Sequence, residues 1–277
     1  MSPSWWGGSG GRSGGTLPPQ LEVHGLVKTF GSLRALDGCA FAVPADGITG
    51  LIGPNGSGKS TLFDCVTGFY RLDAGRVTFR GQPLAGLPPW AVARRGIVRT
   101  FQLTRVFPRM TCLENLLSAP ADQPGEDLVA AVLRPPRVRR AERRLQARAE
   151  ELLARVELTA HADALAGSLS YGQQKLLELA RALMTDPQLL LLDEPAAGIN
   201  PALLDRLLNL IRALHREGKG FLIVEHDMRV VMTLCEQVVV LDYGQTIAAG
   251  SPEDVSRDPR VLDAYLGTAG STLGGSR

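Results

Sequence analysis

The stretch Leu51-Ile52-Gly53-Pro54-Asn55-Gly56-Ser57-Gly58-Lys59-Ser60-Thr61 decides the fold. It fits the phosphate-binding pattern G-x-x-x-x-G-K-[ST] at every fixed position, and that pattern requires a strand before it and a helix after it. Residues 48–52 are apolar and predict a short strand, and residues 60–66 predict a helix that ends near Gly68. The sequence therefore predicts a strand, a phosphate loop and a helix in the required order.

The residue types of this loop suit a polyphosphate. Its glycines let the backbone turn so that N–H groups point inward, and the following helix adds roughly half a positive charge at its N-terminus. Lys59 can reach the β- and γ-phosphates of a nucleotide, and the Ser60 hydroxyl can bind Mg²⁺. We therefore expect the loop to bind nucleotide through all its residues, namely Gly53, Pro54, Asn55, Gly56, Ser57, Gly58, Lys59, Ser60 and Thr61.

Length and composition limit the class of protein. With 277 residues the chain forms one large domain or two small ones, and its net charge of +2 argues against a dedicated nucleic-acid binder. The four cysteines stand singly, without C-x-x-C spacing, which favours reduced thiols in a cytosolic setting over a disulfide framework or a zinc site. No apolar run approaches the roughly 20 residues needed to cross a bilayer.

Both ends of the chain are rich in glycine and serine. Residues 1–20 predict a flexible tail, because this composition buries too little apolar surface to order itself, and they lack the pattern of a secretory signal. The pair Trp5 and Trp6 is alternatively an anchor to a partner. Residues 268–277 predict a frayed C-terminus.

Short apolar segments surround the phosphate loop. Residues 21–23, 40–43 and 77–79 predict antiparallel strands packed beside it. Phe30 lies at a turn before the loop, where its ring can stack on an adenine or can simply be a half-buried loop aromatic. Near the other end, residues 238–250 predict a closing hairpin, followed by a helix capped by Ser251 and a last helix at 261–266.

A second strand places acids where open α/β sheets bind ligands. Residues 189–192 are four leucines between prolines, which predicts a buried parallel strand, and Asp193 and Glu194 follow at its carboxyl end. Asp193 can hold Mg²⁺ and Glu194 can polarise a water that attacks the γ-phosphate. Residues 221–224 repeat the pattern before His226, which can contact the γ-phosphate or serve the structure.

The middle of the chain is helical in pattern. Thr111 and Glu114 form a predicted capping box, and a second helix at about 139–156 carries an apolar face beside an arginine-rich one. That arginine face either is solvated or meets acidic partners or lipid headgroups. Ser170 predicts the N-cap of a further helix over 175–184, and Gly172 leaves the start of that helix open to a ligand.

In this order the residues resemble the nucleotide-binding subunit of an ABC transporter, over residues 21–267. The resemblance assigns Phe30 to the aromatic loop, residues 53–61 to Walker A, and Gln102 to the Q-loop as a metal ligand or water-orienting group. It assigns residues 189–194 to Walker B with Glu194 as catalytic glutamate, and His226 to the switch histidine. The signature is Ser170-Tyr171-Gly172-Gln173-Gln174, in which Ser170, Gly172 and Gln173 contact nucleotide.

The resemblance implies an α/β P-loop NTPase with a RecA-like parallel core, an antiparallel β subdomain and an α-helical subdomain at about 103–168. At the level of subfamily, five stretches look like the ATPase subunits of branched-chain amino acid importers, namely Arg99-Thr100-Phe101-Gln102 and residues 110–115, 196–201, 224–228 and 264–267. Two positions depart from the general pattern. Tyr171 replaces a serine of the signature, and Asn200 replaces the aspartate that ends the D-loop.

The resemblance also implies partners. Two nucleotide domains, either copies or paralogues, meet head to tail so that each signature serves the nucleotide on the other. The pair, with ATP and Mg²⁺, drives membrane permease subunits from the cytoplasmic face of the plasma membrane and does not itself bind the transported molecule or nucleic acid. Alternatives are the ATPase of a urea or lipopolysaccharide transporter and a soluble ABC ATPase that acts on ribosomes or DNA.

Overall fold

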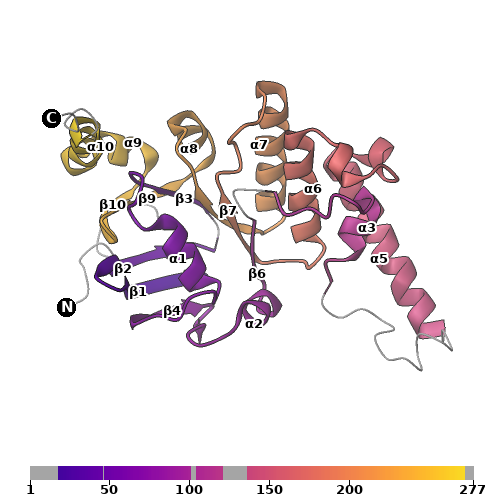
Figure 1. Cartoon of the computed structure of the whole chain (residues 1–277), viewed down its shortest axis with the longest axis horizontal. Coiled ribbons are helices and arrows are strands. Elements are labelled where there is room, and N and C mark those ends of the chain that lie inside the picture. Colours follow the sequence, from indigo (N-terminus) through magenta and orange to yellow (C-terminus); the bar gives the residue numbers. More distant parts are fainter. Residues whose placement is uncertain (1–17, 46, 101–103, 121–135, 272–277) are drawn as a thin grey trace.

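A computed structural model describes residues 18–45, 47–100, 104–120 and 136–271 (Figure 1). Two β-sheets and a helical part make up the molecule, with the sheets on one side of the view in Figure 1 and the helices α3, α5, α6 and α7 on the other. Within the described ranges, no helix is both long enough and apolar enough to cross a bilayer.

The central sheet has six strands in the order β10-β9-β3-β8-β7-β6. All neighbours from β9 to β6 pair in parallel, and β10 pairs antiparallel with β9 at one edge. The strands are β3 (Ile48–Ile52), β6 (Ile97–Arg99), β7 (Leu189–Asp193), β8 (Gly220–Val224), β9 (Gln237–Asp242) and β10 (Gln245–Gly250). The predicted parallel strand at 189–192 and the closing hairpin are thereby confirmed.

The second sheet is antiparallel, with strands in the order β2-β1-β4-β5. They are β1 (Leu21–Phe30), β2 (Leu33–Val43), β4 (Ala74–Phe79) and β5 (Gln82–Pro83). The apolar segments predicted at 21–23 and 40–43 are only the ends of a longer hairpin, whose polar middle contains three register shifts. Those irregularities break the alternation on which the sequence prediction depended.

Helices flank the central sheet and extend beyond it. Next to the antiparallel sheet lie α1 (Lys59–Val66) and α2 (Pro89–Arg94). The helical part contains α3 (Cys112–Leu117), α5 (Pro136–Arg155) and α6 (Tyr171–Leu183), which contact one another, and two short 3₁₀ turns, Thr159–His161 and Ala166–Ser168. The remaining helices are α7 (Pro201–Arg216), α8 (Met228–Leu234), α9 (Pro252–Arg257) and α10 (Pro259–Ser271).

Each face of the central sheet belongs to a different apolar core. In β7, Leu189 and Leu191 pack with α1 and the antiparallel sheet, whereas Leu190 and Leu192 pack with the helices on the opposite face. Because successive side chains of a strand point to opposite faces, a run of leucines fits a strand that is covered on both sides. The fold therefore holds the carboxyl ends of its parallel strands in a fixed row.

Local capping follows the sequence closely. Thr111 accepts a hydrogen bond from the amide of Glu114 while the Glu114 carboxylate accepts one from Thr111, so the predicted capping box of α3 is confirmed. Ser170 caps α6 as predicted, but the helix begins at Tyr171 rather than at residue 175. The earlier start has a physical cause, because Gln173 completes a second capping box with Ser170.

Candidate functional site

The carboxyl ends of three neighbouring strands form the candidate site. β3 pairs with β8 and β8 pairs with β7, all in parallel, so their last residues lie side by side at one edge of the sheet. The phosphate loop follows β3, Asp193 ends β7 and Glu194 follows it, and His226 comes shortly after β8. Ligands of open α/β sheets bind at this edge.

The phosphate loop depends on glycine at two crowded positions. Gly53 has φ of 151°, and a Cβ there would lie 2.0 Å from the carbonyl oxygen of Leu241. Gly58 has φ of 102°, and a Cβ there would lie 2.5 Å from the carbonyl oxygen of Ala35. Any side chain at either position would force the loop away from the strands, so the geometry of the cradle requires these glycines.

Lys59 lies beneath the loop. Its Nζ donates hydrogen bonds to the carbonyl oxygens of Gly53 and Pro54, both at 2.8 Å, and to the Ser57 hydroxyl at 3.3 Å. Burial lowers the pKa of Lys59, and the negative charges of Glu194 and Asp193 act in the opposite direction. The Lys59 ammonium therefore experiences the negative charges of the two carboxylates at the carboxyl end of β7, two strands away in the sheet.

The first backbone N–H groups of α1 have no side-chain cap and can bind an anion. Gly58 is the N-cap of α1 and provides no side-chain hydrogen bond, and the first turn carries no acidic residue. The side chain of Ser60 is exposed there, whereas that of Ser57 is buried. Helix N-termini without a side-chain cap attract anions, so this loop, with its inward turn and its lysine, fits the phosphates of a nucleotide.

Asp193 is held by Arg99, which lies in a subfamily stretch of the sequence but received no role of its own there. Arg99, the last residue of β6, donates to Asp193 Oδ2 at 2.8 Å and also pairs with Asp64 of α1. Its guanidinium lies 5.3 Å from the centre of the Phe63 ring, and its side chain is 8% exposed. Arg99 thereby connects β6, β7 and α1 next to Asp193.

The donor set suits magnesium better than a softer metal. Among the described residues no cluster of three or more His, Cys, Asp or Glu side chains could hold a metal ion. Mg²⁺ often takes one or two protein oxygens, several waters and the phosphates of a substrate. The Ser60 hydroxyl and the Asp193 carboxylate are oxygens of that kind. Gln102, the third predicted metal ligand, lies outside the described residues.

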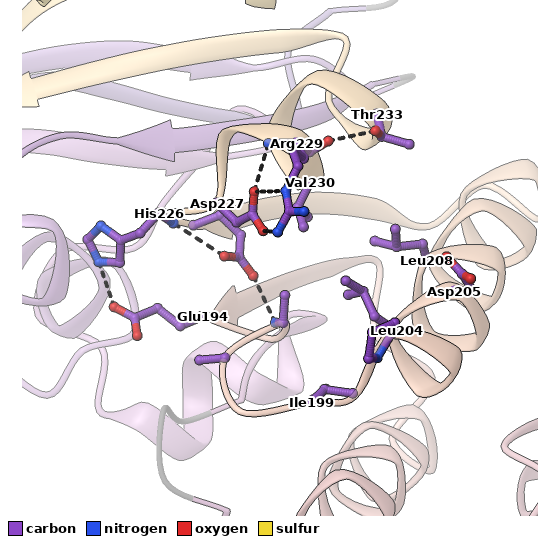
Figure 2. Close-up of a pocket in the computed structure, with 14 residues that line it drawn as sticks. Glu194, Ile199, Leu204, Asp205, Leu208, His226, Asp227, Arg229, Val230 and Thr233 are labelled. Carbon is purple, nitrogen blue, oxygen red and sulfur yellow. Dashed lines mark hydrogen bonds and ion pairs between the residues drawn. The ribbon is translucent and has the colours of Figure 1, made fainter.

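Glu194 and His226 contact each other directly. His226 Nε2 lies 2.7 Å from Glu194 Oε1, and Figure 2 shows the two side chains pointing toward one another from the ends of neighbouring strands. The backbone of Glu194 has φ of 48°, a conformation that non-glycine residues rarely adopt. Such strain costs on the order of 1–3 kcal/mol and persists where surrounding contacts enforce it.

Glu225 is a second residue that lies in a subfamily stretch of the sequence but received no role of its own there. It is 4% exposed, and its carboxylate accepts hydrogen bonds from the backbone N–H groups of Ala196 at 2.8 Å and His226 at 3.2 Å. Burial raises the pKa of Glu225, while these backbone hydrogen bonds and Lys175 oppose the rise. The residue is adjacent to His226 in sequence, and its signal was the unusual position of an acid at the end of a buried strand.

A cavity of about 540 Å³ opens beside Glu194 and His226. Figure 2 shows Leu204 and Leu208 of α7 on one side of it and Asp227, Arg229 and Val230 on the other. Its floor is the segment that follows Glu194, including Ala196, Ala197 and Ile199. The D-loop region thus borders an open, partly apolar hollow next to the predicted catalytic pair.

Phe30 is the last residue of β1. It is 40% exposed, its ring meets the Tyr70 ring edge-on at 5.1 Å, and Lys28 Nζ lies 5.3 Å from its centre. The partial exposure fits a stacking platform, and Tyr70 fixes the orientation of the ring.

The predicted signature residues lie apart from the phosphate loop of the same chain. Ser170, Gly172 and Gln173 belong to the start of α6, which Figure 1 places in the helical half of the view, whereas α1 lies among the sheets. Gly172 packs instead on α7, since a Cβ there would lie 2.2 Å from Leu203 Cδ2. One chain therefore does not bring its own signature onto its own phosphate loop.

Comparison with known proteins covers most of the chain. The family described as ABC transporter matches residues 36–197, and the family described as branched-chain amino acid ATP-binding cassette transporter matches residues 245–271. The first match contains the phosphate loop, the predicted signature, Asp193 at the end of β7 and Glu194 after it. It ends within the segment that borders the cavity.

Individual relatives agree along nearly their full length. The high-affinity branched-chain amino acid transport ATP-binding protein BraF of Pseudomonas aeruginosa is 44% identical over 252 residues, which cover 91% of this chain and 99% of BraF. The corresponding protein LivG of Escherichia coli K12 is 43% identical with the same coverage. A crystal structure of the ADP conformation of an ATP-binding cassette of an ABC transporter is 37% identical, with a TM-score of 0.78, and covers 91% of this chain and 100% of that one.

Proposed function

This chain belongs to the ABC transporter family, and from that membership we propose that it is the ATP-hydrolysing subunit that powers an importer of branched-chain amino acids. The observation that carries the proposal is the row of groups at one edge of the sheet. A glycine cradle with a buried lysine lies within the electrostatic influence of Asp193 and Glu194, and His226 Nε2 lies 2.7 Å from Glu194 Oε1. The relatives' names supply the cargo.

Binding begins with the phosphates. The loop from Gly53 to Thr61 and the start of α1 donate N–H groups to them, and Lys59 exchanges its contacts with the Gly53 and Pro54 carbonyls for contacts with phosphate oxygens. Phe30 stacks on the adenine from the end of β1. Ser60, Asp193 and, as the sequence predicts, Gln102 would hold Mg²⁺, which would offset negative charge on the phosphates.

Hydrolysis requires a water in line with the γ-phosphate. Glu194 orients and polarises that water, which attacks the γ-phosphorus while the bond to the bridging oxygen of ADP breaks. The His226 imidazole, which lies against the Glu194 carboxylate, contacts the γ-phosphate and keeps the carboxylate in place. Because the transition state is loose, these groups act chiefly by position and charge.

The site is completed by a second subunit. The start of α6 lies apart from α1, so Ser170, Gly172 and Gln173 of one chain serve the nucleotide held by another nucleotide-binding subunit. Closing of the pair on ATP and reopening after hydrolysis drive permease subunits from the cytoplasmic face of the membrane. The transported amino acid is bound by other subunits, and nucleic acid has no part in the cycle.

Uptake by cells tests this proposal. We expect a strain lacking this chain to lose uptake of radiolabelled leucine, isoleucine and valine, and expect the wild-type chain, but not the Glu194→Gln variant, to restore it. Membrane permeases should copurify with the tagged chain. Normal uptake of all three amino acids with impaired urea uptake or lipopolysaccharide export would instead identify the corresponding transporter, and copurification with ribosomes would indicate a soluble ATPase.

A further inference from the structure

Lys175, in the first half of α6, has a side chain that none of the motifs above assigns to a role. The residue is 7% exposed. Its Nζ donates to the carbonyl oxygen of Glu194 at 2.8 Å, to that of Pro195 at 3.3 Å and to that of Ala197 at 2.7 Å. A compact ammonium carries three donors, so these three carbonyls use its whole donor capacity.

The same segment also donates a hydrogen bond to a buried carboxylate. Glu225, at the end of β8, accepts the N–H of Ala196, the residue between the carbonyls that Lys175 binds. Lys175 and Glu225 attract each other across the segment, and burial lowers the pKa of Lys175 while Glu225 opposes the decrease. Carbonyls and an amide of one short segment are therefore fixed between two buried, opposite charges.

Packing joins this segment to the start of α6. A Cβ on Gly198 would lie 3.0 Å from Cε1 of the Tyr171 ring, and a Cβ on Gly172 would clash with Leu203. The Tyr171 ring centre lies 5.3 Å from Lys175 Nζ. The backbone at Gly198 thus packs against the Tyr171 ring in the first turn of α6. This close packing leaves little room for the segment after Glu194 to shift relative to α6.

The position of Glu194 depends on this arrangement. Its backbone is in a rarely populated conformation, and its carbonyl is one of the three that Lys175 binds. Without the ammonium, Glu194 would lose one of the contacts that keep its φ positive, and its carboxylate would sample other directions. A misplacement of a catalytic group by about 1 Å can cost about a hundredfold in rate.

We propose that Lys175 is a positioning residue, whose three hydrogen bonds fix the Glu194–Ala197 backbone to α6 so that the Glu194 carboxylate and the signature move as one body. The inference rests on the proposed ATPase function. It extends that function by connecting two sites within one chain. The signature residues serve the nucleotide on the partner subunit, and Lys175 connects them to Glu194, which polarises the water at the nucleotide of the same chain.

The test uses the Lys175→Met variant of the full chain, purified with the subunits that copurify with it. Methionine keeps similar length and removes the ammonium. We expect kcat per bound nucleotide to fall about 10- to 100-fold with KM for ATP unchanged, because the phosphate loop is untouched. Hydrogen exchange of the amides at 194–200 should become faster, since water replaces the ammonium at carbonyls near the surface.

Two further variants sharpen the result. Lys219→Met is the matched control, because Lys219 is a partly buried lysine that pairs with the exposed Asp186 at the opposite end of β8, and its kcat should equal that of the wild type. Lys175→Arg keeps the charge and the donors in a planar fork, so its kcat should lie between those of the wild type and Lys175→Met. If Lys175→Met does not fold, the same measurements on Lys175→Arg decide the question.

The possible results distinguish a failure of the positioning role of Lys175 from a failure of the proposed ATPase function. An unchanged kcat in Lys175→Met would overturn the positioning role. The same conclusion would follow if the rate fell only in proportion to the fraction of protein that no longer binds nucleotide. Faster exchange spread over the whole chain rather than confined to 194–200 would do the same. A wild-type chain that binds no ATP would instead refute the proposed function, so the two failures are distinguishable.

Discussion

At the scale of single residues, the phosphate-binding role proposed for Lys59 can be tested directly. Its ammonium is buried and bonded to two carbonyls of its own loop. Replacement of Lys59 by alanine should weaken ATP binding about 10- to 100-fold, which corresponds to one or two hydrogen bonds to a charged group. Titration calorimetry with ATP measures this, with Lys219→Ala as control. An unchanged affinity would contradict the phosphate role of Lys59.

The residues that the sequence predicted differ physically from those it missed. Lys59, Asp193, Glu194 and His226 belong to patterns that are contiguous in sequence, and their strands make them neighbours. Their roles remain proposals, but their common location could be read from pattern alone. Arg99, Lys175 and Glu225 act through partners far along the chain or through backbone groups, and no spacing rule records a carbonyl acceptor. Lys175 adds only one hint, a charge among leucines on the buried side of α6.

At the scale of elements, strands with regular alternation or continuous apolar character were predictable. The strand predicted at 48–52 and β3 coincide, and β7 extends the predicted strand by one residue. The β1–β2 hairpin was underestimated because its pairing with β4 and its bulges, rather than local preference, maintain its polar middle. The start of α6 lies four residues before the predicted one because Gln173 completes a capping box with Ser170.

Arg99 gives a prediction at this scale, because it joins three elements. Arg99→Met would leave the buried Asp193 and the half-buried Asp64 without their common cation. Loss of one partner from a buried ion pair costs about 3–5 kcal/mol, so the free energy of unfolding should fall by that order. Urea unfolding measures the change, and Arg140→Met on the exposed face of α5 is the control. An equal stability of the two variants would show that the three elements hold together without Arg99.

At the scale of the whole molecule, the separation of α6 from α1 decides how the chain works. The predicted phosphate loop and the predicted signature lie in different parts of one chain, which agrees with our proposal that a complete nucleotide site needs two chains. This arrangement makes the hydrolysis-deficient variant informative. In Glu194→Gln the amide cannot act as a base, and loss of a general base typically slows a reaction about 10²- to 10⁴-fold. ATP should bind and remain intact.

We therefore expect Glu194→Gln with ATP and magnesium to form a particle of twice the chain mass of 29.7 kDa, measured by light scattering after size exclusion. Adding Ser170→Arg, which places a bulky cation at the exposed start of α6, should abolish the dimer at the cost of about 1 kcal/mol of capping. Ser256→Arg on the exposed side of α9 should not. A 29.7 kDa particle for Glu194→Gln in ATP would contradict the pairing of two copies, because the nucleotide would then be held by a single chain.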